Sequence, residues 1–357
     1  MSEDKTSIGR GKQREATIVD VADAAGVAVG TVSRYLNGHP IRRGNRDQIE
    51  QAIERLGYRR NAVAAAMKTD LTNTIGFMVP GLSEFHAAVL ERLSYKMRKA
   101  GKALLTLCHN SDPRSVCDVL DFFATHRVDA LVMDGQDDVG DRIKTLLDHD
   151  TPVVFYDNDV RGLPVDRVFV ENRVASRRAV GHLIDLGHER IGVLTGDLHN
   201  FTGRERLEGY KMALAERGLP LRPSHVIDAH WNYDGGHNGM RALLELPEPP
   251  TAVFSCNYNM THGALALLKE HRLKLPDDLS LVSFDDVPLF ALHDVGITAV
   301  SQPVDKIADT IAGILQRQLA NPAGNAPHTT TTLQCDIILR GSTRRLLTPA
   351  TLGATGS

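Results

Sequence analysis

The sequence is poor in cysteine and contains no long apolar run. Its 357 residues include only four cysteines, Cys108, Cys117, Cys256 and Cys335, and none is paired at a short spacing. Neither a disulfide framework nor a zinc site is therefore expected. No stretch of about 18 uninterrupted apolar residues occurs, so no membrane-spanning helix is predicted. Residues 1–15 also lack the apolar core of a secretory signal, and we expect a cytoplasmic protein without membrane contact.

Motifs of the common enzyme classes are missing as well. The 15 histidines form no H-E-x-x-H zinc pattern, and the chain has neither a nucleophile elbow nor a Walker loop. The glycine pattern Gly192-Val-Leu-Thr-Gly196 is too short to specify a phosphate-binding loop. We therefore expect neither catalysis nor a cofactor. An enzyme built on a parallel sheet is the alternative that turnover of a bound ligand would support.

The net charge of −3 conceals an uneven distribution along the chain. Residues 1–73 carry 12 lysines and arginines against 9 aspartates and glutamates, whereas the remainder carries 29 against 35. A basic end on an acidic body is typical of a nucleic-acid-binding head, although a surplus this small also occurs on ordinary solvated surfaces. With 42% hydrophobic and 24% charged residues, the chain has the composition of a globular protein with two or three packed units.

From Ile75 onward, apolar runs of strand length alternate with amphipathic helical patterns. The runs are Ile75–Val79, Ala103–Cys108, Ala130–Met133, Val153–Tyr156, Val168–Val170, Ile191–Leu194, Ala252–Ser255 and Leu281–Phe284. This alternation predicts parallel sheets with helices on both faces. Because the region is longer than one such sheet needs, we expect two lobes, with a ligand beyond the carboxyl ends of the strands. Residues 16–60 instead show short helical patterns, so the fold class is α/β with an all-α head.

The segment 17–37 predicts two short helices joined by a sharp turn. Thr17 followed three residues later by Asp20 is a variant of the capping box that begins a helix. Gly26 stands where a left-handed residue would end that helix, before a second helix over residues 28–36. Such a helix-turn-helix domain can place its second helix in the major groove of DNA. A generic helical hairpin is the structural alternative.

The helical period leaves one face of the second helix free to contact DNA. Val32 and Leu36 point inward on this period, and the outer face carries Val29, Gly30, Ser33 and Arg34. Arg34 could donate to guanine N7 and O6, and Val29 could contact a thymine methyl group. Thr31 and Ser33 suit phosphate contacts, which position a head without reading the base sequence.

Several motifs of this region resemble the lactose-repressor (LacI/GalR) family of bacterial transcription regulators. They are Asp20-Val-Ala-x-x-Ala-Gly-Val27, Thr31-Val-Ser-Arg-x-Leu-Asn-Gly38, Ala52-Ile53, Leu56-Gly-Tyr58 and Asn61. The resemblance extends over nearly the whole chain. It implies a DNA-binding repressor that meets a pseudo-palindromic double-stranded operator as a homodimer. The implied DNA contacts are Thr17, Val29, Gly30, Thr31, Ser33, Arg34 and Asn37.

Two departures from the family pattern fall in the second helix. Ala28 stands where the family usually has a serine N-cap, which removes a capping bond of about 1 kcal/mol. Gly30 removes a side chain from a position that often reads a base, and it weakens the helix by up to about 1 kcal/mol. Val29 and Arg34 are therefore expected to do most of the base reading.

A third departure falls in residues 61–73, which the resemblance identifies as a hinge helix and linker. Met67 occupies the position of the leucine that wedges into the minor groove, and Ala65 replaces the usual arginine. Methionine is apolar enough to unstack a base step. A helix this short is unstable alone in water, so we expect it to order only on DNA. A passive alanine linker is the alternative.

For residues 74–345 the resemblance implies a two-lobed, periplasmic-binding-protein-like parallel-sheet domain that binds an effector and forms the dimer. The expected N-lobe comprises about residues 74–157 and 291–327, and the C-lobe about residues 158–290 and 328–345. The lobes would then be joined by crossovers near residues 157–160 and 287–291. Residues 1–15 are predicted to be a flexible arm, and the tail, residues 346–357, has no leucine heptads for a coiled-coil tetramer.

Polar residues that match the effector contacts of the family are Asp157, Arg206, Asn257 and Asp285, and Trp231 matches an aromatic that stacks on the ligand. Carboxylates accept hydrogen bonds from vicinal hydroxyls while arginine and asparagine donate, so a sugar or related polyol fits. Phe85 and His86, in the loop after the first strand, are secondary candidates. Arg204 adds positive charge beside Arg206, which raises the hypothesis of an anionic effector such as a sugar acid or sugar phosphate. Tyr258 stands where many members have aspartate, so no relative's specificity is carried over.

These residues also have purely structural interpretations. Asp157 and Asp285 could cap the helices after their strands, Arg206 could form a surface ion pair, and Trp231 could belong to the core. A sugar-binding protein without DNA activity is a further alternative, which the head argues against. The expected mechanism is a population shift in which the effector closes the lobes and alters DNA affinity. Induction and corepression are both compatible with the sequence.

Overall fold

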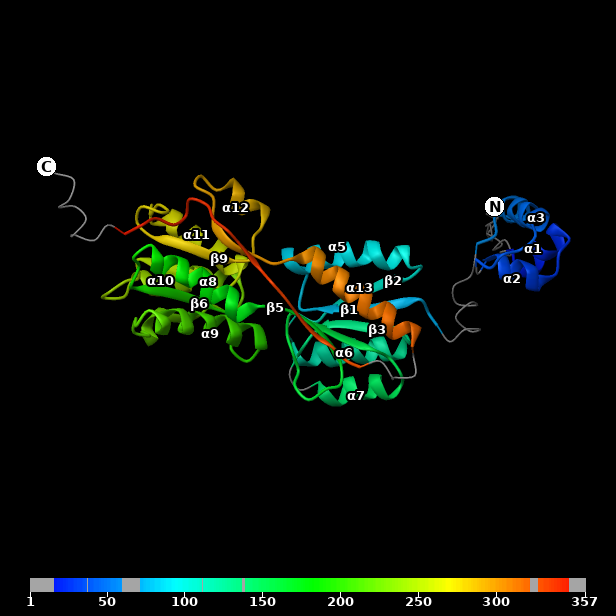
Figure 1. Ribbon diagram of the computed structural model, residues 1–357, viewed down its shortest axis with the longest axis horizontal. Helices are drawn as coiled ribbons and strands as arrows, with labels where there is room; N and C mark the ends of the chain where they lie inside the picture. Colours follow the sequence, from blue (N-terminus) through cyan, green and yellow to red (C-terminus); the bar gives the residue numbers. More distant parts are fainter. Residues whose placement is uncertain are drawn as a thin grey trace, which may run out of the picture. The chain divides into compact units, whose positions relative to one another are not determined.

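The computed structural model describes residues 16–36, 38–59, 71–110, 112–136, 139–321 and 327–346. The chain divides into two compact units, Met1–Thr72 and Asn73–Ser357 (Figure 1). The expected flexible arm, the hinge positions Ala65 and Met67, and the tail beyond residue 346 lie outside the described residues. In the part of the chain that the structure describes, no helix is long and apolar enough to cross a membrane.

The described residues of the first unit form three helices around a small core. The helices are α1 (Ile18–Ala25), α2 (Val29–Leu36) and α3 (Arg43–Leu56). Each helix contributes a completely buried residue to this core: Val21, Val32 and Ile49. The third helix therefore fixes the angle between the first two, and the predicted helix-turn-helix is confirmed.

The ends of α1 are held as the sequence predicts. The Thr17 hydroxyl accepts from the backbone N–H of Asp20, and the Asp20 carboxylate accepts from the backbone N–H of Thr17 at 2.7 Å, which completes the capping box. Gly26 has a φ of 62°, so its left-handed backbone ends α1 and begins the turn. Helix α2 begins at Val29, one residue later than expected.

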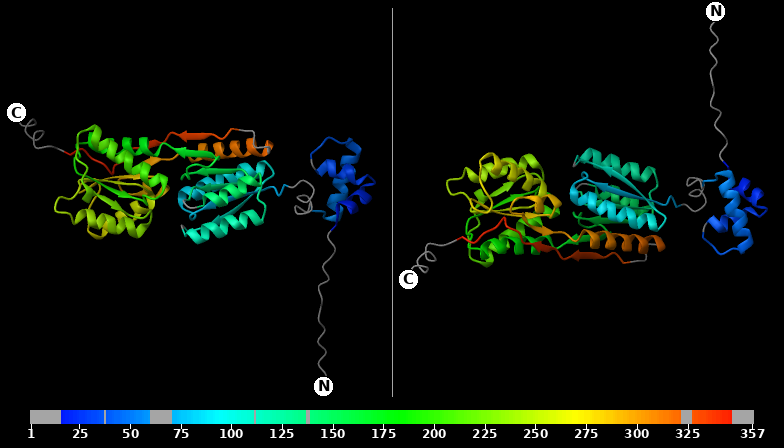
Figure 2. Two further views of the ribbon diagram at one scale, coloured as in Figure 1. Left: turned by 90° about the horizontal axis from the view of Figure 1, so that it is seen from below. Right: turned by 90° about the horizontal axis from the view of Figure 1, so that it is seen from above.

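The second unit contains two six-stranded sheets with helices on both faces (Figures 1 and 2). The first sheet has the order β11-β5-β4-β3-β1-β2, with β1 (Thr74–Val79), β2 (Ala103–Cys108), β3 (Ala130–Asp134), β4 (Val153–Tyr156), β5 (Asp166–Val170) and β11 (Thr330–Leu333). The second has the order β12-β10-β9-β8-β6-β7, with β6 (Ile191–Thr195), β7 (Val226–Asp228), β8 (Ala252–Ser255), β9 (Ser280–Phe284), β10 (Thr298–Ser301) and β12 (Asp336–Ile338). Strand β12 is antiparallel to β10. The other pairs are parallel, so the predicted fold class is confirmed.

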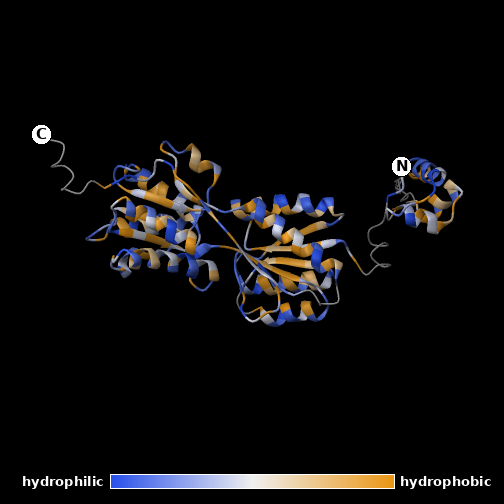
Figure 3. Cartoon of the chain, viewed as in Figure 1, coloured by the Kyte–Doolittle hydropathy of each residue, from blue (hydrophilic) through white to orange (hydrophobic). Residues whose placement is uncertain are grey.

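The part built on the first sheet is the N-lobe, and the part built on the second is the C-lobe. Their helices are α5 (Glu84–Lys99), α6 (Pro113–Thr125), α7 (Gly140–Asp148), α8 (Asn172–Asp185), α9 (Phe201–Glu216), α10 (Tyr233–Leu244), α11 (Tyr258–Glu270), α12 (Pro288–Leu292) and α13 (Val304–Ala320), with a 3-10 turn at Pro223–His225. Apolar residues dominate the strands while the helices alternate apolar and polar positions (Figure 3). Strands β3, β6 and β9 are buried along their whole length, as strands covered on both faces should be.

The chain crosses between the lobes at positions that differ from the expected ones. Strand β5 pairs with β4 in the N-lobe sheet, so the first crossing follows Val170 instead of lying at residues 157–160. Strand β10 pairs with β9 in the C-lobe sheet, so the second crossing lies between Ser301 and Val304 instead of near residues 287–291. Both crossings therefore come later in the chain than the predicted boundaries.

The third crossing, expected between residues 327 and 328, also comes later, between Leu333 and Asp336. Strand β11 joins the N-lobe sheet beside β5, and β12 then joins the C-lobe sheet beside β10. The expected assignment of residues 158–290 and 328–345 to the C-lobe is therefore wrong for β5 and β11, and that of residues 291–327 to the N-lobe is wrong for β10. A strand-length run identifies a strand but not its sheet, because the pairing partners lie far apart in the sequence. The threonine run that forms β11 also lacked the apolar pattern of a buried strand.

Asp166, at the start of β5, ties three distant segments of the N-lobe together. Its buried carboxylate accepts hydrogen bonds from Arg317 and Gln318 at the end of α13, and from the backbone N–H and hydroxyl of Thr329 before β11. Burial alone would raise the pKa of Asp166. The hydrogen bonds from Gln318, Thr329 and Arg317 outweigh it and hold the pKa below its ordinary value.

We predict that Asp166→Asn lowers the unfolding free energy by about 2 kcal/mol at pH 7, because charge-assisted hydrogen bonds become neutral ones. This corresponds to a fall in Tm of roughly 4–8 °C for a domain of this size. A carboxyl with a lowered folded pKa stabilises above its unfolded pKa, near 3.9, and this contribution disappears as the pH falls. The Tm difference between the wild type and the variant should therefore narrow below pH 4 in a calorimetric series. A constant difference across that range would contradict the assigned role.

Candidate functional site

The outer face of α2 presents the residues that the sequence assigns to DNA contact. Val29 is 37% exposed, Gly30 and Arg34 are exposed, and Thr31 and Ser33 are partly exposed. Within the described residues, the Arg34 side chain makes no hydrogen bond or ion pair, so its guanidinium is available to an acceptor outside the chain. A Cβ at Gly30 would meet no atom within 4 Å, so packing does not require glycine there. Asn37 lies outside the described residues.

Helix α2 is held against α3 by a polar contact as well as by the core. The Tyr35 hydroxyl donates to the Glu50 carboxylate at 2.8 Å, and the same oxygen accepts from Arg46 Nε at 2.8 Å. The hydrogen bond to Glu50 raises the pKa of Tyr35. Thr17, the remaining DNA candidate, uses its hydroxyl in the α1 cap, so a DNA contact from it would have to be made around that cap.

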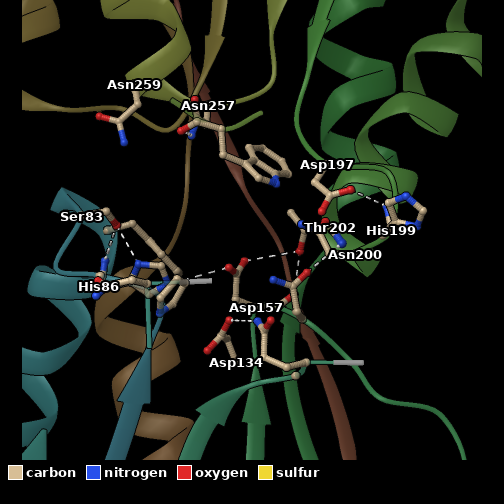
Figure 4. Close-up of a pocket in the computed structure, with 18 of the residues that line it drawn as sticks. Ser83, His86, Asp134, Asp157, Asp197, His199, Asn200, Thr202, Asn257 and Asn259 are labelled. Atoms are coloured by element: carbon tan, nitrogen blue, oxygen red, sulfur yellow. Dashed lines mark hydrogen bonds and ion pairs between the residues drawn. The ribbon is translucent and has the colours of Figure 1, made fainter. Parts of the chain in front are cut away.

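The second unit contains a cavity of about 1010 Å³ between its two lobes. Its walls come from the segments that follow the carboxyl ends of β1, β2, β3 and β4 in the N-lobe and of β6, β7, β8, β9 and β10 in the C-lobe. Figure 4 shows side chains from both lobes pointing into this space. The cavity lies where ligands bind in parallel α/β folds, and its volume is at the upper end of the range for small-molecule sites.

Seven of the eight predicted effector residues line the cavity: Phe85, His86, Asp157, Arg206, Trp231, Asn257 and Asp285. Arg204 does not, and the expectation of an effector contact there is corrected. Its exposed guanidinium donates to the carbonyls of Leu198 and His199. Residues two apart on a helix face different directions, so when Arg206 points inward Arg204 points away. The positive charge that favoured an anionic effector is therefore outside the cavity.

Asp157 and Asp285 follow β4 and β9 with left-handed backbones, at φ values of 62° and 71°. Neither caps a helix, because the next helix after β4 begins only at Asn172, and the N-cap of α12 is Val287. Asp285 accepts a hydrogen bond from Gln302 Nε2 at 2.6 Å. Both carboxylates line the cavity, so the helix-capping interpretation does not account for their placement.

The Asp157 carboxylate carries an unfavourable electrostatic load. Burial raises its pKa, and the neighbouring Asp134 and Asp285 raise it further, while His86 and Arg206 act in the opposite direction. Its closest cationic candidate is His86, whose Nε2 lies 3.9 Å from an Asp157 oxygen. A ligand that donates hydrogen bonds here would relieve that load.

Arg206 is buried, with 3% of its surface exposed, so the surface-ion-pair interpretation is excluded. Its Nε donates to Asn172 Oδ1 at 2.8 Å and its Nη1 donates to the Cys256 carbonyl at 2.6 Å. The guanidinium carbon lies 3.6 Å from the centre of the Phe284 ring and 5.6 Å from that of Trp231. These contacts fix one end of the guanidinium and leave the cavity-facing end for a ligand.

Trp231 is partly exposed and lines the cavity, so it is more than a core residue. Its backbone is left-handed, at φ 61°, and its carbonyl accepts from Asn257 Nδ2 at 3.1 Å. Asn257 also caps α11 by accepting from the N–H of Met260. The sequence predicts that Asn257 contacts the ligand directly. In the structure, most of its hydrogen-bonding capacity is used to position Trp231 and α11.

Sequence reasoning missed several residues of the cavity. Asp134 is completely buried at the end of β3 and lies 3.2 Å from His109 Nε2. Across the cleft, the N–H of Thr202 donates to Asn158 Oδ1 at 3.0 Å, and the N–H of Glu84 donates to the Tyr258 hydroxyl at 2.9 Å. Asp134 directly follows the apolar run Ala130–Met133. A polar residue at the carboxyl end of a strand is the signal that could have identified it, because ligands bind beyond that end.

Known proteins share both units of this chain. Residues 17–61 match the bacterial regulatory proteins of the lacI family, and residues 180–343 match a periplasmic binding protein-like domain. Catabolite control protein A of Priestia megaterium is 31% identical over 307 residues, which cover 85% of this chain and 92% of the relative. The HTH-type transcriptional repressor PurR of Haemophilus influenzae is 29% identical over 339 residues, which cover 93% and 100%. The lac repressor dimer bound to operator and the anti-inducer ONPF has a TM-score of 0.81 at 22% identity, covering 93% and 100%.

We predict that Gly196→Ala displaces the Trp231 ring. A Cβ at Gly196 would lie 1.8 Å from Trp231 Cε2, so the ring must move, and overpacking of this kind costs about 1–3 kcal/mol. Trp231 is the only tryptophan of the chain, so a red-shifted emission and stronger acrylamide quenching would report the change. Gly81→Ala is the control, because Gly81 lines the same cavity as Trp231 but a Cβ there meets nothing within 4 Å. Identical spectra for the two variants would refute the contact.

Proposed function

Because the chain belongs to the LacI family of bacterial regulatory proteins, we propose that it is a transcriptional repressor that binds a pseudo-palindromic operator as a homodimer. A small molecule in the cleft between the lobes controls this binding. The observation that carries the proposal is the combination in one chain of a helix-turn-helix with a free arginine and a cavity lined by polar groups of two lobes. Operator binding takes place in the cytoplasm, where bacterial DNA lies.

The DNA-binding part of the proposal rests on α2. Arg34 is the exposed cation on the face that also carries Val29, and its fork of donors matches the N7 and O6 acceptors of guanine. Thr17, Thr31 and Ser33 would contact phosphates, and Gly30 would let the helix approach the bases closely. Asn37 and the Met67 wedge stay part of the proposal, although they lie outside the described residues.

The regulatory part rests on the hydrogen bonds that join the lobes. Glu84 to Tyr258 and Thr202 to Asn158 each link one lobe with the other beside the cavity. A ligand between the lobes adds contacts only when they are closed, so it shifts the population toward that state. In a homodimer such a shift would change the spacing of the two heads. The ligand is a corepressor if the closed state has the operator spacing, and an inducer if the open state has it. The lac repressor of the similar structure is a dimer bound to operator and to the anti-inducer ONPF, a combination that supports the proposal.

The two rival functions are less well supported. A sugar-binding protein without DNA activity would not need the head, which matches the lacI-family description over residues 17–61. An enzyme on this fold would need a reacting group, and the relatives PurR and catabolite control protein A are regulators by name. Turnover of a ligand added to the purified protein would favour the enzyme.

We predict that Arg34→Ala removes specific operator binding and leaves ligand binding intact. Selection of bound fragments from genomic DNA first identifies the operator, and fluorescence anisotropy then measures affinity. Loss of a bidentate guanine contact costs about 1–3 kcal/mol per head, or roughly 5- to 150-fold in Kd. Arg55→Ala, an exposed arginine at the end of α3, is the control and should change affinity far less.

Three outcomes of this experiment are informative. Loss of affinity for the selected sequence with little change on random DNA supports base reading by Arg34. An equal loss on both sequences makes Arg34 a phosphate contact. Failure of the wild type to enrich any sequence would refute the proposed function.

We further predict that Tyr258→Phe loosens the closed state of the lobes. The hydroxyl accepts from the N–H of Glu84, and a neutral hydrogen bond contributes about 0.5–1.5 kcal/mol, or roughly a two- to tenfold change in population. Hydrogen–deuterium exchange at the Glu84 amide should accelerate by that factor. Tyr233→Phe, an exposed tyrosine of α10 outside the cavity, should leave this exchange unchanged. Unchanged exchange in Tyr258→Phe would exclude the contact as a latch.

A further inference from the structure

Carboxylates outnumber cationic side chains in the cavity. Among the described residues that line it are five aspartates, Asp134, Asp157, Asp159, Asp197 and Asp285, and a single arginine, Arg206. The lining contains no lysine and no glutamate in those residues. The cavity therefore has an excess of hydrogen-bond acceptors with negative charge, which bears directly on the kind of ligand that it holds.

Part of this excess is compensated within the protein. The Asp159 carboxylate pairs with Arg167 Nε at 2.6 Å, and Asp134 faces the buried His109 at 3.2 Å. Setting both pairs aside leaves Asp157, Asp197 and Asp285 against Arg206 alone. Even a proton on His86 would leave one of these three carboxylates without a matching charge from Arg206 or His86.

Two further groups in the cavity have unused hydrogen-bonding capacity. His86 is 8% exposed, and its Nε2 has no hydrogen-bond partner although it lies beside Asp157. Gln302 donates to Asp285, and its own Oε1 is buried without a partner. A buried acceptor without a donor costs free energy, so Gln302 and the Asp157 carboxylate both favour a ligand that donates. The raised pKa of Asp157 points the same way, because burial opposes its charge.

A metal ion is a poor match for this arrangement. No group of three or more histidine, cysteine, aspartate or glutamate side chains in the described part of the chain is close enough to hold one. The carboxylates instead lie at the ends of strands in both lobes, around a cavity of about 1010 Å³ (Figure 4). The compensating charge must therefore be carried by a molecule large enough to reach several of them.

We propose that the ligand of the cleft is a polyhydroxylated compound bearing a protonated amine, of the amino-sugar class, and that the cleft rejects sugar acids and sugar phosphates. This inference rests on the proposed regulatory function and adds the charge of the effector to it. The ammonium donates to Asp157 and Asp285, the hydroxyls donate to Gln302 and accept from Arg206, and the apolar face of the ring stacks on Trp231. An anionic ligand would instead lie among several carboxylates and, within the described lining, would have Arg206 as its single arginine partner.

The first test measures the electrostatic potential of the cavity without any ligand. Trp231, the only tryptophan, lines the cavity, so its quenching by caesium and iodide at constant ionic strength reports the local concentration of each ion. We divide the caesium quenching constant by the iodide quenching constant and normalise this ratio to that of N-acetyltryptophanamide. A negative potential of one kT per unit charge concentrates the cation and depletes the anion, so the ratio should be about 7. Asp157→Asn combined with Asp285→Asn should bring the ratio toward 1. Glu189→Gln combined with Asp336→Asn, two exposed acids outside the cavity, is the matched control. A ratio at or below 1 in the wild type overturns the proposal.

The second test compares glucosamine, glucose and glucuronate by the emission of Trp231 and by Tm. Glucosamine should bind about five- to tenfold more tightly than glucose, the gain expected of a charge-assisted over a neutral hydrogen bond, and glucuronate most weakly. The double asparagine variant should lose this preference while its unliganded Tm shows that it is folded. Tighter binding of glucuronate, equal binding of the amine and the neutral sugar, or no binding by any of the three overturns the proposal.

The two levels of inference fail in different ways. If glucosamine binds preferentially but never changes operator affinity, the cleft assignment stands and the regulatory function is wrong. If glucuronate or glucose controls operator binding while glucosamine does not, the regulatory function stands and the charge assignment is wrong.

Discussion

Arg206 carries a positive charge into the interior of the C-lobe, and the cleft is arranged around it. The guanidinium joins α8 through Asn172, β8 through the Cys256 carbonyl, and the Phe284 and Trp231 rings through their faces. A buried cation without partners would cost several kcal/mol, so these contacts and the nearby carboxylates must be formed together. Burial also raises the pKa of the neighbouring Cys256 thiol to about 12, although the positive charge of Arg206 acts in the opposite direction. The Trp231 ring lies beside this buried charge, and the same charge opposes the effect of burial on the pKa of Asp157.

Features set by residues close in the sequence could be predicted, whereas features set by pairing between distant segments could not. The capping box of Thr17 and Asp20 and the left-handed Gly26 depend on contacts within a few residues, and both are present. Strand-length runs located eight strands, but β7, β10, β11 and β12 were too short or too polar to recognise. The lobe of β5 depends on its pairing with β4 and β11, which no local pattern encodes.

The same distinction applies to the site. Asp157, Arg206, Trp231 and Asp285 were identified because they match positions where the resembled family places effector contacts, and the structure brings them to one cavity. Arg204 was wrongly included because adjacency in the sequence is not adjacency on a helix. The function of Asn257 as a support for Trp231, and the contact of Tyr258 with the N-terminus of α5, require knowledge of which segments face each other. Charge balance in the cavity likewise emerges only when the aspartates that end or follow four different strands, β3, β4, β6 and β9, are placed around one space.

The three crossings between the lobes have a consequence for synthesis of the chain on the ribosome. Helix α13 and strand β11 belong to the N-lobe, and β12 belongs to the C-lobe, yet all three follow the other strands of both sheets in the chain. The head, in contrast, is complete once α3 has emerged. A growing chain therefore passes through a long interval in which the head is finished but both lobes still have open edges, such as the side of β5 that β11 will cover. Non-local closure of this kind is slow, so the nascent chain depends most on protection from aggregation until α13, β11 and β12 have been made.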